Sequence, residues 1–130
     1  MWALWATLAW AERLPTDYHT ELTDAVADTL TGLAAAGTMD KAEDFAARWR
    51  RTVGTPTPGD AARLHYELGL GWRLAGDDAR ALQALDAAVE ADPTLTAARY
   101  DRGEVRLTRG DLTGAAEDFT AVVQQAPTAD

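Results

Sequence analysis

The chain has 130 residues, a length that fits one compact domain or one short array of repeats. It contains no Cys, which excludes disulfides and cysteine-based zinc sites. Twenty-one acidic residues against twelve basic ones give a formal net charge of −9. This charge opposes binding to nucleic acid, because phosphate backbones repel an acidic surface.

The first segment, 1–14, is rich in tryptophan and has no charge before Glu12. It is too short to span a bilayer, and it lacks the basic residues of a membrane-surface helix or a signal peptide. We therefore expect a helix that packs on the rest of the chain or contacts a partner through Trp2, Trp5 and Trp10. We expect no stable membrane span and a cytoplasmic protein, or an exported one if this segment is a signal remnant.

The second segment, 15–56, is predicted to form a helical hairpin and is a candidate degenerate repeat. Its first helix, expected over 16–36, has an apolar stripe at helical spacing, formed by Leu22, Val26, Leu30 and Leu33. Gly37 is expected to end this helix, and Asp40 with Glu43 to cap the next one. The alternative is an unrelated hairpin packed against the array.

The remaining segment, 57–130, begins with Thr57 as a candidate helix cap and Pro58 as the first helical residue. It then repeats itself with a period of 34 residues. The matching positions are Gly69 and Gly103, Gly76-Asp77 and Gly110-Asp111, Ala81 and Ala115, and Pro93 and Pro127. We expect two helix–turn–helix units over 62–95 and 96–129. Gly ends the first helix of each unit, Asp caps the second, and Ala allows the two to cross closely.

The first unit resembles the tetratricopeptide repeat. It reads His65-x-x-Leu68-Gly69-x-x-Trp72, then Ala81-x-x-x-Leu85, then Pro93, where the family has aromatic-x-x-Leu-Gly-x-x-aromatic, Ala-x-x-x-aromatic and Pro. The resemblance implies an all-α fold in which antiparallel helical hairpins stack as a short right-handed solenoid. Counting the upstream segments, about seven helices are expected.

The second unit departs from this pattern, because Arg99, Arg102 and Arg106 stand at mostly apolar positions of one helical face. Arginine stems can pack against apolar surface while their guanidinium groups reach carboxylates. We expect Arg102 to pair with Asp118 across the hairpin, as an ion pair that holds two helices together rather than a functional site.

No residue pattern in the chain predicts catalysis, metal binding or a cofactor. There is no His-x-x-x-His, Gly-x-Ser-x-Gly or phosphate-binding loop. His65 stands at the first aromatic position of the repeat and is expected in the core, and His19 in solvent. Acidic residues fall at helix caps or on exposed faces. We expect a protein that is not an enzyme and needs no metal or cofactor.

The resemblance implies a concave groove, lined by the first helix of each unit, that binds a peptide or protein segment. The residues expected to line it are Arg63, Tyr66, Leu70 and Arg73 in the first unit and Ala97, Tyr100, Glu104 and Leu107 in the second. Spacings of 3, 4 and 3 place each quartet on one helical face. The family's Lys and Asn clamp for chaperone C-termini is replaced here, and the mixed Tyr, Leu and Arg lining favours an apolar or acidic–apolar segment. The alternative occupant is the chain's own Trp-rich segment.

We therefore expect a tetratricopeptide adapter or scaffold. One alternative is a homo-oligomer-forming structural subunit, because Ala116, Phe119 and Val123 would face a missing neighbour at the end of the array. Another is a small secretion-type chaperone that shields an apolar client segment. The uncovered end also implies that the array continues in a partner, or that the chain is a piece of a longer protein.

Overall fold

The computed structural model describes residues 19–125, and within them it is all-helical without a strand, as expected. Six helices are present in this part of the chain: α2 (His19–Ala35), α3 (Met39–Val53), α4 (Pro58–Leu74), α5 (Asp78–Ala91), α6 (Thr96–Thr108) and α7 (Leu112–Gln125). The helix predicted over 1–14, with Trp2, Trp5 and Trp10, lies outside the described residues, as does Pro127.

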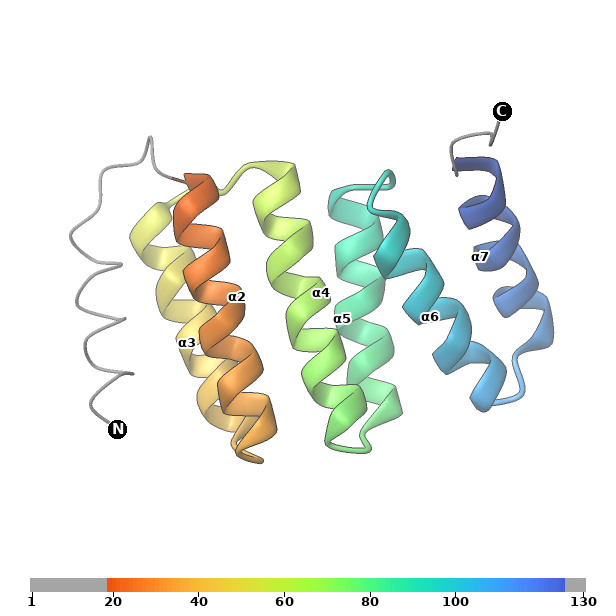
Figure 1. The fold of residues 1–130 in the computed structure, drawn as a ribbon, viewed down its shortest axis with the longest axis horizontal. Helices are drawn as coiled ribbons and strands as arrows, with labels where there is room; N and C mark the ends of the chain where they lie inside the picture. Colours follow the sequence, from red (N-terminus) through yellow and green to blue (C-terminus); the bar gives the residue numbers. More distant parts are fainter. Residues whose placement is uncertain (1–18, 126–130) are drawn as a thin grey trace.

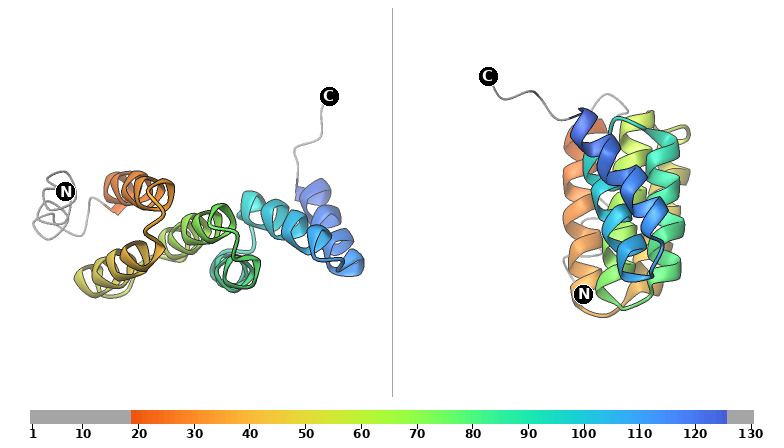
Figure 2. Two further views of the ribbon diagram at one scale, coloured as in Figure 1. Left: turned by 90° about the horizontal axis from the view of Figure 1, so that it is seen from below. Right: turned by 90° about the vertical axis from the view of Figure 1, so that its right-hand side faces the viewer.

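The six helices form three antiparallel hairpins that follow one another in a row (Figure 1). Viewed from below, α2, α4 and α6 lie along one side of the row, and α3 and α5 along the other (Figure 2, left). Within hairpins, α4 packs on α5 and α6 on α7. Between hairpins, α2 packs on α4 and α5 on α6. Each hairpin therefore packs against the next one in the row.

All three hairpins turn in the same way. Gly37, Gly76 and Gly110 follow the first helix of each hairpin with φ of 73°, 82° and 84°, a left-handed conformation that favours glycine. The N–H of Gly76 donates to the Arg73 carbonyl at 3.0 Å, and the next N–H, of Asp77, donates to the Trp72 carbonyl at 2.9 Å. The same pair of bonds closes the other two turns. The predicted helix end at Gly37 is confirmed.

The predicted caps of the repeat units are confirmed. The carboxylate of Asp77 accepts the Arg80 N–H at 3.0 Å, and that of Asp111 accepts the Gly114 N–H at 2.9 Å. Thr57 accepts the Asp60 N–H at 3.2 Å before a helix that starts at Pro58. These bonds satisfy amides that the first turn of a helix leaves without a partner.

The predicted capping pair Asp40–Glu43 is wrong. The helix begins at Met39, before Asp40, and Thr38 stands at the cap position without a side-chain cap bond. The Thr38 hydroxyl instead donates to the Leu33 carbonyl at 2.9 Å, across the turn. Glu43 is one turn into the helix, and its carboxylate accepts a bond from α4.

The main core lies where α2, α3 and α4 meet. Its largest members are Leu30, Phe45, Trp49, Leu64 and Leu68, all buried. The predicted stripe of α2 contributes Val26, Leu30 and Leu33, and α3 contributes Ala42, Ala46 and Trp49. A helical period of 3.6 residues places each of these sets on one buried face.

Glycines at matching positions let the helices of the last two hairpins approach closely. A Cβ atom at Gly69 would lie 2.8 Å from Leu85 Cγ, and one at Gly103 would lie 2.8 Å from Phe119 Cε1. The residue pairs Gly69–Leu85 and Gly103–Phe119 are 34 positions apart, as the repeat predicts. Phe119 therefore packs inward, and the expectation that it faces a missing neighbour is wrong.

Candidate functional site

Tyr66 and Arg73 of α4 bind the same carboxylate of α6. The Tyr66 hydroxyl donates to Asp101 Oδ2 at 2.7 Å, and Arg73 Nη1 donates to Asp101 Oδ1 at 3.3 Å. Arg73 Nη2 reaches further along α6 to Glu104 Oε2 at 2.9 Å. Three of the predicted groove residues thus share one network that joins two hairpins. We call Tyr66, Arg73, Asp101 and Glu104 the α4–α6 network.

The protonation states of this network suit its hydrogen bonds. Burial raises the pKa of Tyr66, and the bond to the Asp101 carboxylate raises it further, so the phenol keeps its proton. Hydrogen bonds from Tyr100 and Arg73 lower the pKa of Glu104, which remains ionised. Because Arg73 is neutralised by two carboxylates, it offers little to an acidic ligand.

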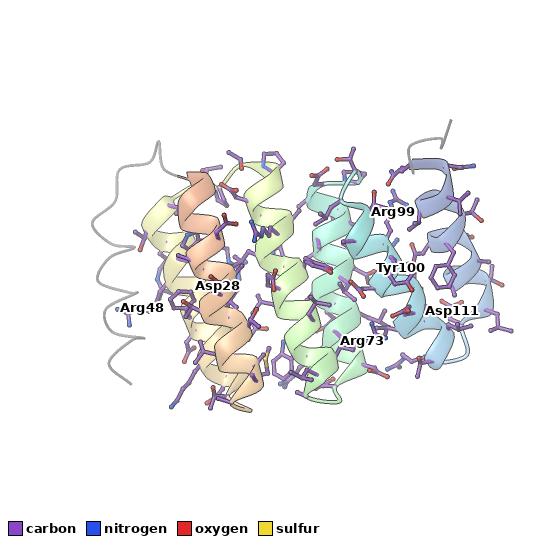
Figure 3. The ribbon with its side chains drawn as sticks, in the orientation of Figure 1. Asp28, Arg48, Arg73, Arg99, Tyr100 and Asp111 are labelled. Atoms are coloured by element: carbon purple, nitrogen blue, oxygen red, sulfur yellow. The ribbon has the colours of Figure 1, made fainter. Side chains whose placement is uncertain are left out.

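The predicted face also presents apolar surface. Tyr100 is 47% exposed and Leu107 51% exposed, whereas Leu70 is half-buried. The Tyr100 ring lies 5.8 Å from the Phe119 ring, tilted by 56°. Figure 3 labels Tyr100 and Arg73 on this face. An exposed aromatic ring is therefore held in place on its apolar side by a second ring.

The other predicted residues of this face lie apart from the network. Arg63, near the start of α4, forms an ion pair with Asp24 of α2, and Ala97 is exposed. Asp101, which joins Tyr66 to Arg73, was missed by the sequence analysis. The signal that could have found it is its spacing of three from Glu104, which places both carboxylates on one side of α6.

A second feature is a cleft of about 370 Å³ on the α3 and α5 side of the row, where these two helices meet α4. Its lining residues are Glu43, Arg50, His65, Leu68, Trp72, Arg80, Gln83, Ala84 and Ala87. We call it the α3–α5 cleft. Trp72 Nε1 donates to Glu43 Oε1 at 2.7 Å, and the Arg80 guanidinium lies 4.6 Å above the Trp72 ring. His65, expected in the core, is half-buried and lines this cleft.

The predicted Arg102–Asp118 pair is confirmed. Arg102 Nη2 lies 2.7 Å from Asp118 Oδ1, and Arg102 Nε lies 3.0 Å from Oδ2. Arg106 Nη1 also donates to Asp118 Oδ2, at 2.9 Å. The Asp118 side chain is 2% exposed, and Arg102 reaches back to Asp86 of α5 at 3.1 Å. Arg99 instead donates to the Pro93 carbonyl at 3.1 Å.

Comparisons with known proteins add no assignment. No family model matches the chain, and no curated protein matches it. Within residues 19–125, no group of three His, Asp or Glu side chains is placed to hold a metal ion. In the same part of the chain, every helix is too short or too polar to cross a lipid bilayer.

Proposed function

We propose that this chain is a non-enzymatic interaction module of tetratricopeptide type, which binds a peptide or protein segment across α4 and α6. The family assignment is supported by equivalences at a spacing of 34 residues. They include the turns at Gly76 and Gly110 and the close helix contacts at Gly69 and Gly103. The turn at Gly37 extends the pattern to the upstream hairpin.

The observation that carries the proposed function is the Tyr100–Leu107 surface of α6. Both residues are about half exposed, lie two turns apart on one helical face, and adjoin the α4–α6 network. Rigid aromatic residues on a fixed backbone are typical anchors of protein interfaces, because they bury a large area at a small entropy cost. Arg63 and Arg73 on this face are already paired with carboxylates of the chain. The surface therefore favours a partner segment that is apolar at its centre.

Replacing Tyr100 by Ala is expected to weaken partner binding by about 2 kcal/mol, roughly thirty-fold, because the anchor ring is removed. The measurement is affinity capture with the immobilised chain, followed by titration of each captured protein against parent and variant. Leu74→Ala is the matched control, since Leu74 is an exposed apolar residue at the end of α4 and outside the α4–α6 network. Equal binding by parent and Tyr100→Ala would overturn the assignment of this surface.

A second candidate function, assembly into homo-oligomers, is favoured by the outer face of α7. Val89 of α5 is 8% exposed because α6 packs on it, whereas Val123, at the matching position of α7, is 74% exposed. Leu112, at the start of α7, is 65% exposed. This face is equivalent to one that is covered in the preceding hairpin, so a second copy of the chain is a natural cover.

Light scattering tests this second candidate directly. We expect the parent chain to have a mass above 14.0 kDa that rises with concentration, and the Val123→Asp variant to remain at the monomer mass. A charge at the centre of an apolar interface costs several kcal/mol, which is enough to separate the copies. A parent chain that is monomeric at every concentration would exclude assembly through α7.

A further inference from the structure

The α3–α5 cleft has a defined length and two different ends. Each lining helix contributes residues seven positions apart, namely Glu43 and Arg50, His65 and Trp72, and Arg80 and Ala87. Seven residues of helix rise by about 10 Å. Because α3 and α5 run in one direction and α4 in the other (Figure 1), Glu43, Trp72 and Arg80 meet at one end. Arg50, His65 and Ala87 lie at the opposite end.

The end at Trp72 is filled by interactions within the chain. The indole N–H is bound by Glu43, and the ring face is covered by Arg80. Together these contacts connect α3, α4 and α5 and fix the ring as one wall of the cleft. Arg80 keeps an exposed guanidinium, 3.6 Å from Asp77.

The end at Arg50 is different, because its charge is not matched. Arg50 is half-buried, and its guanidinium makes no ion pair or hydrogen bond with any residue in the range 19–125. Beside it, His65 has a lowered pKa, caused first by burial and then by the positive charge of Arg50, with Glu43 acting in the opposite direction. The ring is therefore neutral near pH 7 and has a nitrogen lone pair and an N–H for hydrogen bonding.

In the next layer of the row, the positions that correspond to Leu68, Trp72 and Ala84 hold charged residues. There, Arg102 and Arg106 are neutralised by Asp118, and Arg102 also binds Asp86 on α5. In the α3–α5 cleft the middle of the floor is apolar instead, with the half-buried Ala84 and the buried Leu68. An unmatched guanidinium beside apolar surface is suited to a ligand that carries a carboxylate next to an apolar group.

We propose that the α3–α5 cleft binds an extended acidic–apolar peptide segment, with one acidic side chain on Arg50 and an apolar side chain on Ala84 and Ala87. Alternate side chains of an extended peptide point the same way and lie about 7 Å apart, which fits a cleft about 10 Å long. The net charge of −9 opposes general electrostatic attraction of such a segment, so its binding depends on the local positive charge of Arg50. This site lies on the other side of the row from Tyr100 and goes beyond the proposed function.

The probe is the peptide acetyl-Glu-Ser-Leu-Ser-Glu-amide, which presents a carboxylate on either side of an apolar side chain. Its match is acetyl-Gln-Ser-Leu-Ser-Gln-amide, which has the same shape without charge. Binding is followed by NMR on the indole N–H of Trp72 and the ring of His65. Their signals are identified from the Trp72→Phe and His65→Gln spectra. We expect saturable shifts with a Kd of about 1 mM or below for the acidic peptide, and binding at least about ten-fold weaker for the amide peptide.

Two arginine variants separate a specific site from general charge attraction. Arg50→Gln is expected to weaken binding of the acidic peptide about ten-fold. The matched control is Arg51→Gln, because Arg51 is an exposed neighbour outside the cleft, and it should weaken binding less than about two-fold. Tyr100→Ala should leave this binding unchanged, so failure of the α4–α6 surface and failure of the cleft are distinguishable. The proposal is overturned if no shift saturates below about 10 mM, if the amide peptide binds equally, or if both arginine variants act alike.

Discussion

Replacing Asp118 by Ala is expected to lower the free energy of unfolding by about 3–5 kcal/mol. The variant leaves two arginines, with side chains 14% and 23% exposed, facing each other without the carboxylate that neutralises both. Removing one partner of a buried ionic cluster is costly because the remaining charges keep their desolvation penalty. Urea unfolding followed by circular dichroism measures the change. A loss below about 1 kcal/mol would show that the cluster contributes no more than a surface pair.

The first repeat unit shows which substitutions should restore the stability lost in Asp118→Ala. At the positions that correspond to Arg102, Arg106 and Asp118, it has Leu68, Trp72 and Ala84. The triple variant Arg102→Leu, Arg106→Trp, Asp118→Ala is expected to have a free energy of unfolding within about 1 kcal/mol of the parent's. The reason is that packed apolar side chains can replace a buried ion cluster with little loss of stability. The triple variant should therefore be much more stable than Asp118→Ala alone.

Single changes at Arg102 test the same pairing. Arg102→Leu should fold, because Asp118 keeps its bond to Arg106. Arg102→Asp should not fold, because it places a second carboxylate beside a buried one. A stable Arg102→Asp protein would contradict the ion pair as the reason for these residues.

The second large effect is expected at Gly69. Gly69→Ala should lower the free energy of unfolding by about 1–3 kcal/mol, although alanine is the better helix former. The new Cβ would lie 2.8 Å from Leu85 Cγ, and Leu85 is fully buried, so α4 and α5 must move apart. Thermal or urea unfolding of the purified variant measures this loss.

Gly32→Ala is the matched control, since Gly32 is also within a helix but has no atom within 4 Å of the position of a new Cβ. This change should stabilise the protein by about 0.5–1 kcal/mol, because alanine loses less backbone freedom on folding. The opposite signs at the two glycines separate helix packing from helix propensity. The same sign at both positions would show that close approach of α4 and α5 is not what Gly69 provides.

Features that depend on neighbours in the chain could be predicted from the sequence. The turn glycines, the Thr57 and Asp77 caps and the helix starting at Pro58 agree with the structure. Each rests on bonds between residues a few positions apart. The Arg102–Asp118 pair was also predictable, because the repeat places the two residues on facing helices of one hairpin. The capping rule failed at Asp40 and Glu43, because the helix already begins at Met39.

The candidate sites depend on contacts between hairpins, which are harder to predict from sequence. Helical spacing places Tyr66, Arg73, Tyr100 and Glu104 on one face, but it does not reveal Asp101, which joins the first two. The repeat pattern predicts His65 in the core and gives no sign of the cleft on the opposite side.

By itself, then, the sequence determined most helix ends within residues 19–125 and the 34-residue spacing of the last two hairpins. Only the tertiary structure decided that Glu43 binds Trp72, that Phe119 packs inward and that Arg50 has no partner among the described residues. The physical reason is the range of the interactions. Helix propensity, capping and turn conformation act over a few residues, whereas pairing and burial between hairpins depend on how far each helix is rotated and shifted against its neighbours.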